Sequence, residues 1–371
     1  MEYRQMKLIG SLLGMMLLFF FGGSAQCNGA FSLCDKKYDE VAYLTTHNAF
    51  NSAQDNFNLP NQNLDITGQL DMGVRAFMLD VYNWFGNTVV YHGSAILGTN
   101  TLEEELTKIK VFLDNHPTEV VTIILECYVS ANDIEAEMNL TGLLPYAYEH
   151  QSGTEWPTLQ EMVNSNKRCV VFSDVDDASS SQGWYHYMWT NMVETHFSNN
   201  DISDFSCDFN RGDSINDLFI LNHFVTNDVL GTGLEAESEI VNSNPFFINR
   251  ALQCQQEKTK FPNFVTVDFV ELGDSKLVVD QLNGIEPLSI GESHFQNHVS
   301  VSPNPTEGWL SVSSNEHAID DLRVFNLAGK EVTQKISFQI DNHTCTLNCT
   351  SLENGIYFVQ SGLFSARFIK E

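Results

Sequence analysis

The feature of this sequence that most limits its fold is a set of apolar runs without alternation between polar and apolar residues. Val120–Tyr128 is largely apolar and is interrupted by Glu126, and Val41–Thr46 and Phe264–Val270 have the same character. A strand that is buried on both faces needs apolar side chains on both, as in a parallel sheet covered by helices. These runs therefore predict the central strands of a parallel α/β sheet.

Segments with helical periodicity alternate with these runs. In Thr101–His116 apolar side chains recur every three or four residues, Thr101 and Glu104 form a capping box, and Pro117 follows. We expect further helices at 134–148, 159–165, 235–258 with a break at Asn244-Pro245, and 276–285, and further strands at 76–82, 89–91, 169–175 and 218–224. This alternation predicts an irregular (β/α) barrel. A doubly wound sheet is the alternative, but no Gly-rich turn supports it.

The pattern of polar and apolar residues changes from Val299 onward. Short alternating segments surround Leu310–Val312 and Leu322–Asn326, with turn residues at 327–330 and at Asn354-Gly355. Short strands separated by such turns predict a small all-β sandwich. The expected organisation is a signal peptide at 1–26, the barrel at 27–287, a linker at 288–298 and the β-sandwich at 299–371.

The N-terminal segment has the pattern of a secretory signal peptide. Arg4 and Lys7 precede the apolar run Leu8–Phe21, and small residues follow. An uncleaved anchor would need roughly 18 apolar residues, more than this run supplies. A lipoprotein acylated at Cys27 is disfavoured because Gln26 stands where a small residue is expected.

Cysteines and charge agree with an exported protein. Eight cysteines predict disulfides, and we expect the pairs Cys27–Cys34, Cys207–Cys254 and Cys345–Cys349, with Cys127 and Cys169 as buried thiols. The net charge of -29 lacks the basic footprint that nucleic-acid binding requires, and it opposes attraction to anionic membranes.

Three of the predicted strands end on polar residues within fifty positions. His47-Asn48 follows the first strand, Asp80 lies near the end of the second, and His92 follows the third. Catalytic side chains collect at the C-terminal strand ends of a parallel barrel. Two histidines and a carboxylate there favour acid–base chemistry, with separate structural roles as the alternative.

The oxygen-bearing side chains at these strand ends suggest a hard cation. An ionised Glu126 inside an apolar run must be paired or bound to a cation. Together with Asn48 and Asp80 it supplies oxygen ligands suited to Ca²⁺, or alternatively Mg²⁺, rather than zinc. A salt bridge between Glu126 and Arg75 is the competing interpretation. Arg75 could instead contact a phosphate or pair with Asp80.

Several separated motifs resemble the X-region of phosphatidylinositol-specific phospholipase C and its PLC-like phosphodiesterase relatives. The resemblance covers roughly Cys27–Ile285 and is carried, in order, by Leu44–Asn48, Gly73–Tyr82, Tyr91-His92, Val120–Glu126, Asn191–Glu194, Leu221–Phe224 and Pro262–Phe269. It implies a distorted TIM barrel that cleaves the glycerol side of a phosphodiester.

The resemblance also implies roles for individual residues. His47 matches the general base and His92 the general acid, while Asn48, Asp80 and Glu126 match Ca²⁺ ligands. The metal-independent bacterial branch has an arginine in place of Asp80, so Asp80 favours a metal. Residues expected beside the substrate are Arg75, Asn222 and Asp268, the last either orienting His47 or serving as a structural carboxylate.

Two departures from the family pattern bear on substrate and metal. Met78 occupies a position that is usually acidic, so the cation site lacks one ligand. Acids in Val170–Asp176 stand where phosphoinositide-selective members carry lysines, and they would repel a polyphosphorylated headgroup. We therefore expect phosphatidylinositol, a glycosylated inositol lipid or another phosphodiester as substrate, and no preference for a bisphosphate.

Two other functions compete with this one. A glycerophosphodiester phosphodiesterase also uses two histidines and a metal, although it usually has an arginine after the first histidine, where Asn48 stands. A catalytically silent binding barrel is favoured by Met78. The aromatic run Trp184–Trp189 is either a lipid-facing rim or part of the core.

The C-terminal module resembles the type A sorting domain of the type IX secretion system. Pro303–Gly308, Val324–Lys330 and Asn354–Phe358 match its successive motifs. This implies handling by the type IX machinery and a secreted or cell-surface location, with a carbohydrate- or partner-binding module as the alternative. We expect a monomer whose lipid substrate is compatible with transient contact with a membrane surface.

Overall fold

The computed structural model describes residues 26–151, 153–177, 183–227, 232–285, 299–314, 319, 322–326, 330–361 and 364–371. The predicted linker and nearly all of the predicted signal peptide lie outside this range. The chain divides into two compact units, one up to Ile285 and one from Glu286, which we describe separately. In the described part of the chain, every helix is too short or too polar to span a bilayer.

The first unit is built on parallel strands in nearly circular order. These strands are β1 (Tyr43–Thr46), β2 (Ala76–Trp84), β5 (Val121–Cys127), β6 (Cys169–Ser173), β7 (Tyr185–Tyr187), β8 (Met192–Thr195), β10 (Leu218–Asn222) and β11 (Phe264–Val267). Their order in the sheet is β7-β6-β5-β2-β1-β11-β10-β8. The last of these strands in the sequence, β11, therefore pairs with the first, β1. Within the described residues no ladder joins β7 to β8, which leaves the barrel open there.

This arrangement is a distorted TIM barrel, as predicted. The strands follow one another around the ring, whereas a doubly wound sheet reverses its order at a switch point. Three short strands extend the sheet antiparallel: β3 (Asn87–Val90) on β2, β4 (Asn100–Thr101) on β3 and β9 (Phe209–Gly212) on β8.

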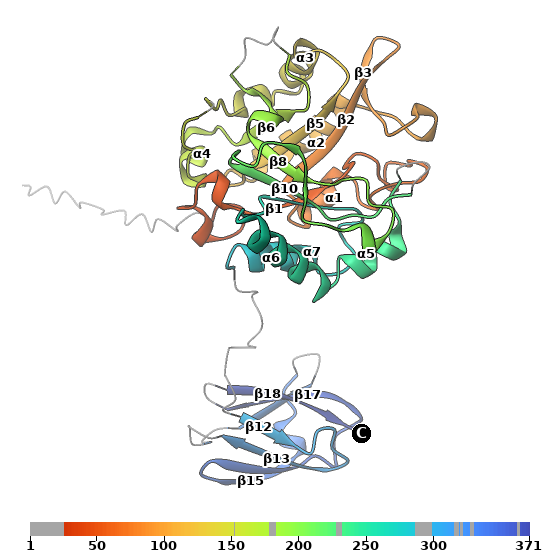
Figure 1. Cartoon of the computed structure of the whole chain (residues 1–371). Helices are drawn as coiled ribbons and strands as arrows, with labels where there is room; N and C mark the ends of the chain where they lie inside the picture. Colours follow the sequence, from red (N-terminus) through yellow and green to blue (C-terminus); the bar gives the residue numbers. More distant parts are fainter. Residues whose placement is uncertain are drawn as a thin grey trace, which may run out of the picture. The chain divides into compact units, whose positions relative to one another are not determined.

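Helices cover the outside of the strands (Figure 1). They are α1 (Ile66–Asp71), α2 (Leu102–Asn115), α3 (Ala131–Thr141), α4 (Leu159–Ser165), α5 (Glu235–Val241), α6 (Phe246–Lys258) and α7 (Ser275–Leu282). The capping box of α2 is present, and the break at Asn244-Pro245 separates α5 from α6. The helix predicted at 134–148 ends earlier, because Gly142 adopts a left-handed conformation that terminates α3.

Both faces of the central strands are buried, which explains their continuous apolar sequences. Tyr43 and Phe264 pack inside the barrel with Phe172, whereas Leu44 and Val265 pack in the layer beneath the helices. Polar side chains appear where the strands end, and the catalytic candidates lie at these positions. The candidate site therefore lies next to the core, at the C-terminal ends of the barrel strands.

Two predicted disulfides are confirmed and one is wrong. Cys27–Cys34 and Cys207–Cys254 are bonded, and Cys127 and Cys169 are buried free thiols. Cys345 and Cys349 are both free. Cys345 lies in an extended strand, where a separation of four residues spans about 13 Å at roughly 3.3 Å per residue. A disulfide needs Cα atoms within about 7 Å.

The second unit is an antiparallel β-sandwich, as predicted. Its strands are β12 (Val299–Ser302), β13 (Trp309–Ser314), β14 (Arg323–Asn326), β15 (Ser337–Asp341), β16 (Thr344–Asn348), β17 (Gly355–Ser361) and β18 (Phe364–Lys370). They form the sheets β12-β13-β16-β15 and β14-β17-β18. Leu310 and Leu347 of one sheet share a core with Val324, Val359 and Phe368 of the other.

Candidate active site

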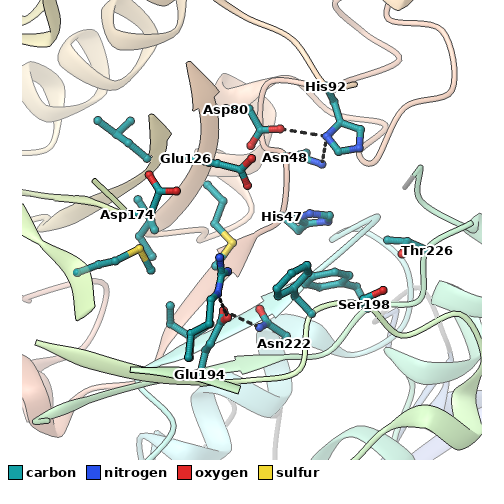
Figure 2. A pocket seen from close by; sticks show the side chains of 18 of the residues that line it. His47, Asn48, Asp80, His92, Glu126, Asp174, Glu194, Ser198, Asn222 and Thr226 are labelled. Carbon is teal, nitrogen blue, oxygen red and sulfur yellow. Dashed lines mark hydrogen bonds and ion pairs between the residues drawn. The ribbon is translucent and has the colours of Figure 1, made fainter. Parts of the chain in front are cut away.

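A pocket of about 360 Å³ opens at the C-terminal ends of the barrel strands (Figure 2). Residues at the ends of β1, β2, β5, β8 and β10 line it. Most of the residues expected at the site are among them, namely His47, Asn48, Asp80, His92, Glu126 and Asn222. Parallel strand direction brings these side chains together although they span 176 positions, from 47 to 222.

His47 directly follows β1 and is held from two sides. Its Nδ1 lies 3.0 Å from Oδ1 of the buried Asp268, and its ring stacks on Phe224 with centroids 4.0 Å apart. A carboxylate accepts hydrogen bonds, so Asp268 favours the tautomer with hydrogen on Nδ1. That leaves Nε2 of His47 as the basic nitrogen.

His92 lies in the loop after β3, on the other side of the pocket. Its Nδ1 is 3.0 Å from Asp80 Oδ2 and 3.1 Å from Asn48 Nδ2. Burial lowers the pKa of His92, but the hydrogen bond and charge of Asp80, helped by Asp268 and Glu126, outweigh it and raise the pKa above its usual value. The rings of His92 and His47 have centroids 6.4 Å apart.

Asn48, Asp80 and Glu126 contribute oxygen atoms to the same pocket. Asn48 has φ +46°, a left-handed conformation that asparagine tolerates better than most residues. Asp80 and Glu126 are direct neighbours on β2 and β5, so both side chains point to the same face. Loss of solvation raises the pKa of Glu126, and the charges of Asp80 and Asp174 add to it.

The chemistry of these donors fits a hard cation, although the protein supplies only part of a ligand set. Repulsion among the carboxylates is what a bound cation would relieve. Among the described residues, no three His, Cys, Asp or Glu side chains gather closely enough to hold a metal by themselves. Ca²⁺ would therefore need the Asn48 amide together with water or substrate oxygens. Met78, which the resemblance places at a usually acidic position, lines the same pocket.

A second polar group was missed by the sequence analysis. Glu194 of β8 is buried; its Oε1 lies 2.5 Å from Arg211 Nε and its Oε2 accepts from Asn222 Nδ2 at 3.1 Å. Among the described pocket residues, Arg211 is the one cationic Lys or Arg side chain. An acid inside the apolar strand Met192–Thr195 was a usable signal for Glu194. The irregular polar segment around Arg211 offered none.

The aromatic run Trp184–Trp189 does not form a lipid-facing rim. Trp184, Tyr185 and Met188 are buried and belong to the apolar core. Trp189 lies beneath Arg211, whose guanidinium carbon is 4.6 Å from its ring centroid. The core interpretation of this run is therefore correct.

Arg75 is absent from the pocket, which contradicts the expected contact with substrate. It precedes β2 and so lies at the opposite end of the strand from the site. Its Nε lies 2.7 Å from Glu119 Oε2, and Nη1 donates to the carbonyl groups of Leu70 and Val74. Pairing of Arg75 with Asp80 or Glu126 is excluded for the same reason. Arg75 is a structural residue.

Replacing Arg75 with alanine should lower stability without changing catalysis. The side chains of Arg75 and Glu119 are 14% and 11% exposed, and removing one partner leaves the other charge poorly solvated. We expect a loss of about 2–3 kcal/mol in the free energy of unfolding. Urea denaturation measures it. A raised KM with unchanged stability would show that Arg75 contacts substrate after all.

Fold and pocket together define a barrel of the phospholipase C-like phosphodiesterase class. Residues 33–283 match the PI-PLC X family model, which is more than half of the chain. The chain therefore belongs to the PI-PLC X family. Residues 300–363 match the secretion system C-terminal sorting domain. With a relative that is named as a secreted protein, this assigns the protein a secreted or cell-surface location.

The similar proteins span plants, fungi and bacteria. A PI-PLC X domain-containing protein of Arabidopsis thaliana is 29% identical, over 67% of this chain and 62% of its own length. An uncharacterized secreted protein of Arthroderma benhamiae is 26% identical, over 67% and 61%. This chain thus spans about three-fifths of both relatives. A solved phosphatidylinositol-specific phospholipase C from Listeria monocytogenes has 16% identity and a TM-score of 0.46, over 68% of this chain and 95% of that one.

Proposed function

We propose that this protein is a secreted phosphodiesterase of the phosphatidylinositol-specific phospholipase C type, acting on an inositol phospholipid or a related phosphodiester. The observation that carries the proposal is the pair of histidines that faces one pocket. His47 is held by Asp268 and His92 by Asp80, each through Nδ1, and the ring centroids are 6.4 Å apart. This spacing suits a phosphorus centre between a proton acceptor and a proton donor.

In the proposed reaction the two histidines transfer protons on opposite sides of the phosphorus. Nε2 of His47 accepts the proton of the inositol 2-hydroxyl, whose oxygen forms a bond to phosphorus. The bond between phosphorus and the glycerol oxygen breaks, and His92 gives its proton to that oxygen. The products are a cyclic inositol phosphate and diacylglycerol. The raised pKa of His92 favours its protonated form, which suits the acid.

Ca²⁺ is the proposed cofactor, with Mg²⁺ as the alternative. Asn48, Asp80 and Glu126 would hold it beside the two histidines. When bound, the ion stabilises negative charge on the phosphoryl oxygens. His47 and His92 still carry out the proton transfers. The positive charge of the ion would offset the negative charges of Glu126 and Asp80, which would reduce their repulsion of an anionic substrate.

Phosphatidylinositol turnover tests the proposal directly. The purified chain, supplied with Ca²⁺ and phosphatidylinositol, should release a cyclic inositol phosphate detectable by ³¹P NMR. Cleavage of glycerophosphoinositol to glycerol phosphate without a cyclic product would indicate a glycerophosphodiester phosphodiesterase instead. Binding of the lipid with no turnover of either substrate would indicate a silent barrel, the second candidate, which Met78 in the pocket favours.

Phosphatidylinositol should be preferred to its bisphosphate. Asp80, Glu126, Asp174 and Glu194 line the pocket, and the single cation among its described residues, Arg211, is engaged by Glu194. Added phosphates on the ring would meet this negative surface. We expect kcat/KM to be at least about tenfold lower for the bisphosphate, since uncompensated like charges cost more than about 1.4 kcal/mol at such range. Asp174→Lys should reduce the difference in kcat/KM between phosphatidylinositol and its bisphosphate. Equal or better turnover of the bisphosphate would refute the preference.

A further inference from the structure

Asn61 occupies a buried position between two groups that contact the histidines. Asp268 uses both carboxylate oxygens: Oδ1 lies 3.0 Å from His47 Nδ1, and Oδ2 accepts from Asn61 Nδ2 at 3.1 Å. Both Asp268 and Asn61 are fully buried. Because a carboxylate only accepts hydrogen bonds, the Asn61 amide must turn its NH₂ group toward Asp268.

This orientation determines what the other end of Asn61 can do. Its Oδ1 accepts from Asn51 Nδ2 at 2.7 Å and from Asn48 Nδ2 at 3.3 Å. The Asn48 amide is thereby turned with its NH₂ toward Asn61. The same NH₂ lies 3.1 Å from His92 Nδ1 (Figure 2), but it does not donate there when that nitrogen carries the hydrogen that Asp80 accepts. Among the described residues Asn48 Oδ1 has no hydrogen-bond partner, which leaves it available to a cation.

The backbone holds Asn61 in place between two segments far apart in the sequence. Its amide N–H donates to the Asn51 carbonyl at 3.0 Å, and its own carbonyl accepts from Phe269 N–H at 2.9 Å. Gly233 approaches so closely that an added Cβ would lie 3.0 Å from Asp268 Oδ2 and 3.2 Å from Asn61 Cα. The pair is therefore enclosed, with little room for a second side-chain orientation.

We propose that Asn61 is a positioning residue that sets, through one amide, both the Asp268 carboxylate behind His47 and the Asn48 amide beside His92. The inference rests on the proposed function, since it assigns a role within the same reaction. Asn61 touches neither substrate nor cation itself. It links the environment of the proton acceptor to that of a proposed cation ligand, so one substitution should disturb both.

Asn61→Asp tests this with little change in shape, because it replaces the NH₂ donor by an oxygen that repels Asp268. Asn61→Leu removes both polar atoms. In each variant we expect kcat on phosphatidylinositol to fall about 10- to 100-fold with KM nearly unchanged. Titration calorimetry with Ca²⁺ alone should show affinity weakened by a similar factor. The ¹⁵N shifts of His47 should report hydrogen on Nδ1 in the wild type and a mixed tautomer in Asn61→Asp.

Asn263→Asp is the matched control, since Asn263 is an equally buried amide at the opposite end of β11 that bonds the carbonyl groups of Asp39 and Val41. It should cost stability but leave the His47 tautomer and kcat unchanged. Circular dichroism and thermal melting establish that each variant folds. Asn61→Asp with wild-type kcat and an unchanged His47 tautomer would overturn the inference, as would an effect matched by Asn263→Asp. A wild type without turnover would refute the proposed function, and the tautomer and Ca²⁺ measurements would then decide the inference alone.

Discussion

His47→Ala is expected to reduce kcat on phosphatidylinositol by about 10²- to 10⁴-fold, the range typical for loss of a general base. The structure leaves Nε2 of His47 as the basic nitrogen, since Asp268 engages Nδ1 at 3.0 Å. Without the imidazole, only water could accept the proton of the attacking hydroxyl. The effect should fall on kcat, because His47 contributes to the transition state more than to substrate binding. Release of cyclic inositol phosphate measures it.

The same substitution at His116 provides the control for His47→Ala. His116 is an exposed histidine at the C-terminal end of α2, where its Nδ1 lies 2.9 Å from the Phe112 carbonyl oxygen. It is not among the pocket residues. His116→Ala should retain wild-type turnover. Activity of His47→Ala within about threefold of the wild type would remove His47 from the chemistry.

Asp80→Asn is expected to produce the second largest loss, and to make activity depend on higher Ca²⁺ concentrations. Asp80 combines two duties, since Oδ2 lies 3.0 Å from His92 Nδ1 and the carboxylate is a proposed cation ligand. Replacing the carboxylate with an amide removes the negative charge that faces His92 and the negative charge that would bind the cation. We expect kcat to fall about 100-fold and the Ca²⁺ concentration for half-maximal activity to rise at least about tenfold. Initial rates across a Ca²⁺ titration give both values.

Chelation provides the complementary measurement. Removing Ca²⁺ from the wild type with EGTA should abolish turnover, and added Ca²⁺ should restore it. Asp174→Asn removes a carboxylate from the same pocket that lies outside the proposed ligand set, so its Ca²⁺ dependence should stay close to that of the wild type. Full activity of the wild type in EGTA would leave Ca²⁺ without a role, and full activity in EDTA would exclude Mg²⁺ as well.

The barrel was predictable because most of its strands lie in continuous apolar runs that are separated by periodic helices. The site was predictable to the extent that it follows the ends of the parallel ladders: His47 directly follows β1, and Asp80 lies near the end of the parallel pairing of β2 with β5. Arg75 shows the limit of reading proximity from sequence. It is only five positions from Asp80, yet it precedes β2 whereas Asp80 lies in the middle of that strand. Five residues of extended chain, at roughly 3.3 Å per residue, place them about 16 Å apart.

Other features depend on tertiary contacts that leave little trace in the sequence. The opening between β7 and β8 arises where the strands are only three and four residues long, too short to identify by periodicity. Arg211 reaches the pocket from β9, an antiparallel strand of mostly polar residues. Asn61 lies in a turn-rich loop, and its burial against Asp268 follows from the pairing of β1 with β11.

That pairing joins the first strand of the ring to the last, in register from Tyr43 with Phe264 to Thr46 with Val267. His47 and Asp268 each come one residue after this pairing, following β1 and β11 respectively, and they are 221 positions apart in the chain. A partly folded molecule in which these strands have not met holds the imidazole without the carboxylate that orients it. Competence for proton abstraction therefore requires the pairing of β1 with β11, which closes the longest loop of the parallel pairs, and a turnover assay also counts the molecules that have completed it.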